Sequence, residues 1–103
     1  MSAVNIKMVA EVIGRVAINR PEKRNALNAE VRQTLISELP ALLQDESVQG
    51  LVLTGEGGHF CAGGDIASME GLDAKTARKR MKDNHQIVRM IVEAEKPVIT
   101  AIE

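Results

Sequence analysis

The first third of the chain carries two short apolar runs with strand-like character. They extend from Asn5 to Glu11 and from Val16 to Asn19, and Ile13-Gly14 lies between them. Two such runs around a glycine-containing turn predict a β-hairpin. Pro21 has no amide hydrogen to donate, so strand pairing is expected to stop there.

Apolar residues then recur at helical spacing from Ala29 to about Gln44. Asn28 precedes the pattern and is a good N-cap, because its side chain can accept a hydrogen bond from a free helix amide. Pro40 lies inside the pattern and is expected to kink the helix or divide it in two. The predicted buried stripe is Val31, Leu35, Leu39 and Leu42, widened by Ile36 and Leu43.

The second half reads as a strand, a loop, a helix and a strand. Gly50 to Thr54 is apolar enough to be buried on both faces of a sheet, and Val98 to Ile102 forms the last strand. Between them, Asp73 is expected to cap a long helix that ends near Ala94, before Pro97. Such a βαβ unit predicts parallel strands with a right-handed crossover. The buried stripe expected for this helix is Ala77, Met81, Val88 and Val92, with Ile91 beside them.

Composition limits the protein class. The 103 residues make one domain, 1–103, with 45% apolar residues and a formal charge of −1, so no global field favours nucleic acid or an anionic membrane. One cysteine excludes an internal disulfide. Neither a run of about 20 apolar residues nor a signal-peptide pattern occurs. We therefore expect a cytoplasmic protein without a membrane partner.

The stretch from Thr54 to Met69 contains five of the eight glycines, the only cysteine and the only aromatic residue. It follows a strand of the βαβ unit, at the end where such units bind ligands. Asp65 or Ser68 could cap short helical structure over Ile66 to Met69. Phosphate-loop and dinucleotide-binding glycine motifs are absent, and the histidines and Cys61 lack the spacing of a zinc site.

The residues of this stretch can also be explained by structural roles alone. Its glycines can serve only to permit positive φ, Cys61 can be a small buried residue, and Asp65 can be a helix cap. The turn Gly63-Gly64-Asp65-Ile66 fits a more specific role. Where a glycine turn enters a helix, free amides point outward and can stabilise an oxyanion.

Four stretches of the chain form an ordered set of motifs: Ile18 to Asn28 (INRPEKRNALN), Val48 to Gly55 (VQGLVLTG), His59 to Ile66 (HFCAGGDI) and Lys96 to Glu103 (KPVITAIE). In this order they resemble the enoyl-CoA hydratase/isomerase family, also called the crotonase family. The resemblance covers essentially the whole chain, and it implies an α/β fold that is the N-terminal portion of a ββα spiral, a β-hairpin followed by βαβ units.

The resemblance also implies a binding site for an acyl-CoA thioester, with coenzyme A as part of the substrate and no further cofactor or metal. The Gly64 N–H matches the first of two oxyanion-hole donors. Ala62, Asp65 and Ile66 match the loop that contacts the adenine end of CoA, and Gly63 belongs to the same segment. Lys23, Arg24 and Ala26 match the segment that lines the pantetheine and phosphates. The match leaves open which of Lys23 and Arg24 reaches a phosphate, or whether both are solvated loop charges.

Members of that family are normally much longer, and the resemblance places the second oxyanion donor and the acid–base carboxylates beyond Glu103. Two hypotheses follow. The chain is the N-terminal part of a hydratase- or isomerase-type enzyme, inactive alone and forming a trimer or hexamer when intact, or it is a short CoA-binding or oligomerisation module without turnover.

Nucleic-acid binding is a weaker interpretation. It rests on Lys75, Arg78, Lys79, Arg80 and Lys82, which are expected on the solvated face of the long helix. Single-strand binders also need stacking aromatic residues, and Phe60 is the only one in the chain. We therefore expect no nucleic-acid partner.

Overall fold

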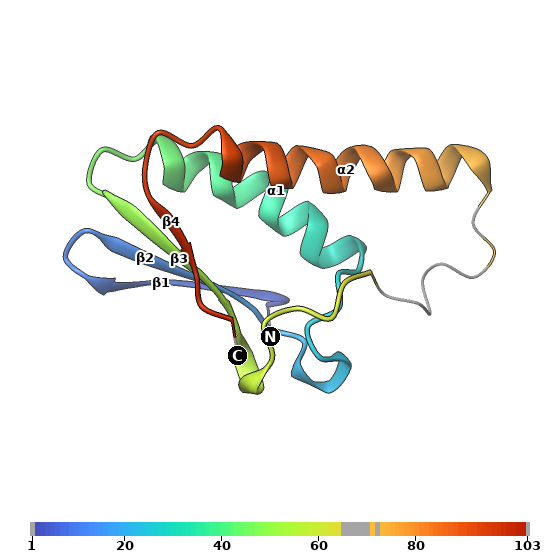
Figure 1. Cartoon of the computed structure of the whole chain (residues 1–103), viewed down its shortest axis with the longest axis horizontal. Helices are drawn as coiled ribbons and strands as arrows, with labels where there is room; N and C mark the ends of the chain where they lie inside the picture. The colour runs from blue at the N-terminus through green and yellow to red at the C-terminus, as the bar shows by residue number, and fades with distance from the viewer. Residues whose placement is uncertain (1, 65–70, 72, 103) are drawn as a thin grey trace.

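The computed structural model describes residues 2–64, 71 and 73–102. These residues form a mixed α/β fold in which a four-stranded sheet, in the order β1-β2-β3-β4, carries two helices on one face (Figure 1). The strands are β1 (Val4–Ala10), β2 (Ile13–Ile18), β3 (Gly50–Gly55) and β4 (Val98–Thr100), and the helices are α1 (Ala29–Gln44) and α2 (Ala74–Val92).

The predicted hairpin is confirmed, but its turn was misplaced. β1 and β2 pair antiparallel, with Ala10 opposite Ile13, so residues 11 and 12 form the turn. Gly14 lies inside β2 and is buried. A Cβ on Gly14 would stand 3.0 Å from Leu51 Cδ2. The glycine therefore permits close packing of β2 against a side chain of β3 instead of forming a turn.

Both predicted βαβ connections are present. β2 pairs parallel with β3, with Ile13 opposite Gly50 and Ile18 opposite Gly55, and β3 pairs parallel with β4. β3 is buried on both faces over most of its length, as its apolar sequence predicted. Because β2 and β3 run in the same direction, the loops that follow them leave from the same edge of the sheet (Figure 1).

Helix α1 has the predicted bounds and cap. The Asn28 side chain accepts a hydrogen bond from the Val31 amide, at 2.9 Å. The predicted division at Pro40 is wrong, because the helix continues through it to Gln44. The core forms where α1 packs on the sheet, and its central buried residues are Val16, Ile18, Val31, Leu35, Leu39, Leu51 and Leu53.

Helix α2 begins after the predicted cap, Asp73, whose side chain accepts from the Thr76 amide at 2.7 Å. This hydrogen bond lowers the pKa of the Asp73 carboxyl below its ordinary value. The predicted short helix over 66–69 lies outside the described residues. Among the described residues, no helix is long and apolar enough to span a bilayer.

The predicted buried stripe of α2 is confirmed only in part, since Ala77 and Ile91 are half-buried but its other three members are exposed. Met81 and Val88 are each 58% exposed, and Val92 is 75% exposed. The buried residues of the helix are Arg80 and Ile87, and Ile91 is half-buried. The packed side therefore follows positions 80, 84, 87 and 91, where two members are polar. Hydrophobicity alone placed Met81, Val88 and Val92 on the buried face, although each lies one residue, or about 100°, away from the packed side.

The packed side of α2 yields a stability prediction. Ile87→Ala should lower the free energy of unfolding by about 2–4 kcal/mol, because it leaves a cavity between α2 and the core. Val88→Ala, its exposed neighbour, should change it by less than about 0.5 kcal/mol. Urea unfolding followed by circular dichroism measures both values. Equal losses would contradict the observed orientation of α2.

Candidate functional site

Two loops that leave the same edge of the sheet are hydrogen-bonded to each other. The first follows β2 and contains the short 3₁₀ turn Pro21–Lys23, and the second follows β3 and contains the turn Glu56–Gly58. We call them the 20s loop (residues 19–28) and the glycine loop (residues 56–64). Their shared position follows from the parallel pairing of β2 with β3.

Backbone bonds join the far ends of the two loops. The Ala62 amide donates to the Arg24 carbonyl at 3.0 Å, and the Leu27 amide donates to the Gly63 carbonyl at 2.7 Å. Leu27 and Gly64 form an isolated parallel bridge. The sequence-predicted residues Lys23, Arg24 and Ala26 are thereby brought beside Ala62, Gly63 and Gly64. Asp65 and Ile66 lie outside the described residues.

The Gly64 amide is directed away from the 20s loop. Leu27 makes its hydrogen bond to the residue before Gly64, and in a parallel bridge of this kind the opposite residue turns its own N–H and C=O outward. Gly64 is exposed, and its N–H donates to no other group among the described residues. Gly63 supports this arrangement with a φ of 103°, which favours glycine, and its amide donates to Cys61 Sγ at 3.4 Å.

The side chains of the site differ in burial. Lys23 and Arg24 are exposed, with their charges in solvent, whereas Ala26 is 8% exposed. Arg20 Nη1 donates to the Ala26 carbonyl at 2.7 Å and holds the chain there. Arg24 has a φ of 52°, in the left-handed region, so the loop turns sharply between its charged part and Ala26.

Asn25 is the residue of this site that the sequence reasoning missed. It is fully buried, and its φ is 59°. Its Oδ1 accepts from the Arg20 amide at 2.7 Å, and its Nδ2 donates to the carbonyls of Glu56 and His59 at 2.8 and 2.6 Å. The available signal was residue type, since asparagine is enriched among non-glycine residues with positive φ.

Gly55, at the end of β3, makes room for this network. Its φ is −132°, so its backbone conformation does not require glycine. A Cβ there would overlap the carbonyl oxygens of His59 and Phe60. The absence of a side chain therefore allows the glycine loop to fold back over the strand end, where Asn25 reaches it.

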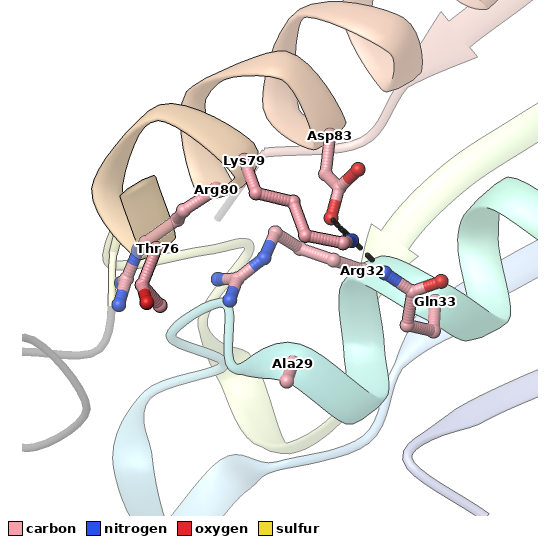
Figure 2. Close-up of a pocket in the computed structure, with 7 residues that line it drawn as sticks. All are labelled: Ala29, Arg32, Gln33, Thr76, Lys79, Arg80 and Asp83. Carbon is pink, nitrogen blue, oxygen red and sulfur yellow. Dashed lines mark hydrogen bonds and ion pairs between the residues drawn. The ribbon is translucent and has the colours of Figure 1, made fainter. Parts of the chain in front are cut away.

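A second polar region lies between the two helices (Figure 2). It is a cleft of about 250 Å³ lined by Ala29, Arg32, Gln33, Thr76, Lys79, Arg80 and Asp83. Asp83 Oδ2 accepts from Lys79 Nζ at 2.9 Å and from Gln33 Nε2 at 3.0 Å. Arg32, which is 6% exposed, donates to the Leu27 carbonyl at 3.1 Å. These contacts join α1 to α2 and to the 20s loop, which is a structural role.

The sequence pattern of the enoyl-CoA hydratase/isomerase family matches residues 9–103, which include both loops. The chain belongs to this family. A crotonyl-CoA hydratase from Syntrophomonas wolfei is 38% identical over 93 residues, which cover 89% of this chain and 36% of that protein. The 4-chlorobenzoyl coenzyme A dehalogenase-2 of an Arthrobacter species is 31% identical over 94 residues, 87% of this chain and 34% of that protein.

Solved structures show the same fold. An enoyl-CoA hydratase from Bacillus anthracis matches 98% of this chain with a TM-score of 0.93 at 22% identity. The match covers 40% of the hydratase chain. The fold is therefore that of the crotonases, and the chain spans well under half the length of the relatives that it matches.

The close approach at Gly55 yields a prediction for the site. Gly55→Ala should lower the free energy of unfolding by more than about 3 kcal/mol, because the new methyl group overlaps the glycine loop. Gly58→Ala is the matched control. It meets no atom within 4 Å but has a φ of 89°, so it should cost only about 1–2 kcal/mol of backbone strain. Thermal and urea unfolding measure both, and a Gly55→Ala protein as stable as Gly58→Ala would contradict the described packing.

Proposed function

We propose that the chain binds an acyl-CoA thioester across the 20s loop and the glycine loop, as part of an enoyl-CoA hydratase/isomerase-type enzyme. The observation that carries the proposal is the direct bonding of Arg24 and Leu27 to the segment Ala62–Gly64. This bonding brings the loop with the exposed cations Lys23 and Arg24 next to the segment that carries the outward-facing Gly64 amide. The names of both relatives above contain an acyl-coenzyme A, although their reactions differ.

In this proposal the 20s loop holds the coenzyme A portion. Lys23 and Arg24 are exposed, and among the described residues their side chains have no bonding partner that they would lose on approaching a phosphate. Charge-assisted hydrogen bonds to phosphate are stronger than neutral ones. Ala26 presents a small side chain where the pantetheine passes, and Ala62, Gly63, Asp65 and Ile66 supply the contacts to the adenine end.

The Gly64 amide supplies polarisation of the thioester carbonyl. When the thioester is converted to its enolate, negative charge accumulates on the carbonyl oxygen. A fixed N–H directed at that oxygen stabilises the charge by roughly 3–4 kcal/mol when water is excluded. Because Gly64 has no side chain, a ligand atom can approach its nitrogen closely.

We further propose that the chain alone is catalytically incomplete. Gly64 supplies one donor, whereas an oxyanion hole uses two, and proton transfer or water addition requires positioned acid–base groups. The family resemblance places the second donor and those carboxylates beyond residue 103. We also propose that copies of this chain associate. We place the protein in the cytoplasm, because its single cysteine, Cys61, forms no internal disulfide.

Calorimetric titration with acetyl-CoA tests the binding part. The double variant Lys23→Ala/Arg24→Ala should weaken binding about tenfold or more, because charge-assisted bonds contribute roughly 1.5–3 kcal/mol each. Arg78→Ala/Lys82→Ala removes the same charge from exposed positions of α2 and should weaken binding less than about threefold, by long-range electrostatics alone.

Equal weakening by the two double variants, or no binding by the unmodified chain, would exclude the proposed binding mode. Turnover is assayed on the same samples through the ultraviolet absorbance of crotonyl-CoA. Hydration should be undetectable, and a rate clearly above the buffer control would show that the chain is catalytically complete.

A further inference from the structure

Asn25 has two features that are costly separately and are found together. Its polar side chain is fully buried, and its backbone has a φ of 59°. A buried amide without partners destabilises the fold, and most residues other than glycine and asparagine are strained in the left-handed region. Three hydrogen bonds of 2.6–2.8 Å offset the first cost. The position therefore requires both a tolerant backbone and this particular set of polar atoms.

The three bonds connect different parts of the site. Oδ1 closes the 20s loop onto its own start at Arg20. Nδ2 reaches more than 30 residues along the chain and donates to two carbonyls of the glycine loop, those of Glu56 and His59. One planar amide thus fixes the shape of one loop and its distance from the other.

The backbone bonds between the loops lie on either side of Asn25 in sequence. They involve Arg24 on one side and Leu27 on the other. Arg24, Ala62 and Gly63 are exposed and Leu27 is half-buried, whereas the Asn25 side chain is fully buried. Water therefore competes less for the Asn25 amide than for the backbone groups, and we expect the backbone bonds to depend on the alignment that Asn25 sets.

We propose that Asn25 is a positioning residue, which sets the separation between the 20s loop and the Gly64 amide. It thereby determines the position of the thioester carbonyl of a bound acyl-CoA relative to the Gly64 N–H. This proposal rests on the proposed function above. Its physical basis is that coenzyme A would contact both loops at once, so a shift of about 1 Å between them misaligns the carbonyl with its donor. Asn25 itself is buried and does not touch the ligand.

Two substitutions of Asn25 distinguish the roles of its acceptor oxygen and its donor nitrogen. Asn25→Gly keeps the left-handed backbone and removes all three side-chain bonds. Asn25→Asp keeps an acceptor for the Arg20 amide but replaces the donor to the glycine loop with an oxygen. Asn19→Ala is the matched control. It removes another side-chain amide of the same loop, which donates to the Ser2 carbonyl at 3.0 Å and does not reach the glycine loop.

Amide hydrogen exchange tests the positioning role without any ligand. In both Asn25 variants the Ala62 and Leu27 amides should exchange at least about tenfold faster, although neither bonds to Asn25. The amides of Leu35 and Leu39 in α1 should keep their rates, as should all four amides in Asn19→Ala. Equal acceleration at all four positions would mean a general loss of stability, and unchanged rates at Ala62 and Leu27 would mean no link, so either result overturns the proposal.

Titration with acetyl-CoA then connects positioning to binding. Asn25→Gly and Asn25→Asp should each weaken binding about tenfold or more, because the loops must be ordered at the moment of binding, and Asn19→Ala should weaken it less than about twofold. Unchanged affinity in the Asn25 variants overturns the proposal. If the unmodified chain does not bind acetyl-CoA, the proposed function fails, and the exchange rates alone decide whether Asn25 aligns the two loops.

Discussion

The geometry of the candidate site depends on the hydrogen bonds of one buried side-chain amide, that of Asn25. Loops at the end of a sheet have few buried contacts of their own, so their relative position must be fixed by specific bonds. Here one side chain satisfies the Arg20 amide and two carbonyls of the glycine loop. The exposed features of the site, the charges of Lys23 and Arg24 and the amide of Gly64, belong to chain segments that this network holds together.

The sheet makes that network possible. Parallel pairing brings the ends of β2 and β3 to one edge, with Ile18 opposite Gly55. Gly55 then lets the glycine loop return closely over the strand end, because any Cβ would overlap its carbonyls. The two loops are then held together by close packing at Gly55, by the buried Asn25 side chain and by the two backbone hydrogen bonds between the loops. The cleft between α1 and α2 contributes indirectly, since Arg32 holds the Leu27 carbonyl.

Sequence patterns predicted the elements and the buried face of α1, but not the whole buried face of α2. The bounds and cap of α1, the Asp73 cap of α2 and the parallel strands follow from local signals, namely helical periodicity, side-chain caps and apolar runs. The buried side of α2 could not be predicted in this way, because Arg80 and Ile87 pack inward while Val88 is exposed. The glycine loop was located correctly, but Asn25 was missed, because a buried polar residue is recognised only once its partners, here more than 30 residues away, are known. Gly14 was misassigned to a turn because only the packing of Leu51 reveals its role.

The central claim is that the Gly64 amide faces the carbonyl of a bound thioester. The most direct measurement is the ¹H–¹⁵N spectrum of the chain during titration with acetyl-CoA and, separately, with coenzyme A, which has no thioester carbonyl. Both ligands should shift the amides of Arg24 and Ala62, and only acetyl-CoA should shift the Gly64 proton strongly downfield, because only its thioester carbonyl can accept the new hydrogen bond. Identical Gly64 shifts with the two ligands, or shifts confined to the cleft between α1 and α2, would contradict the central claim.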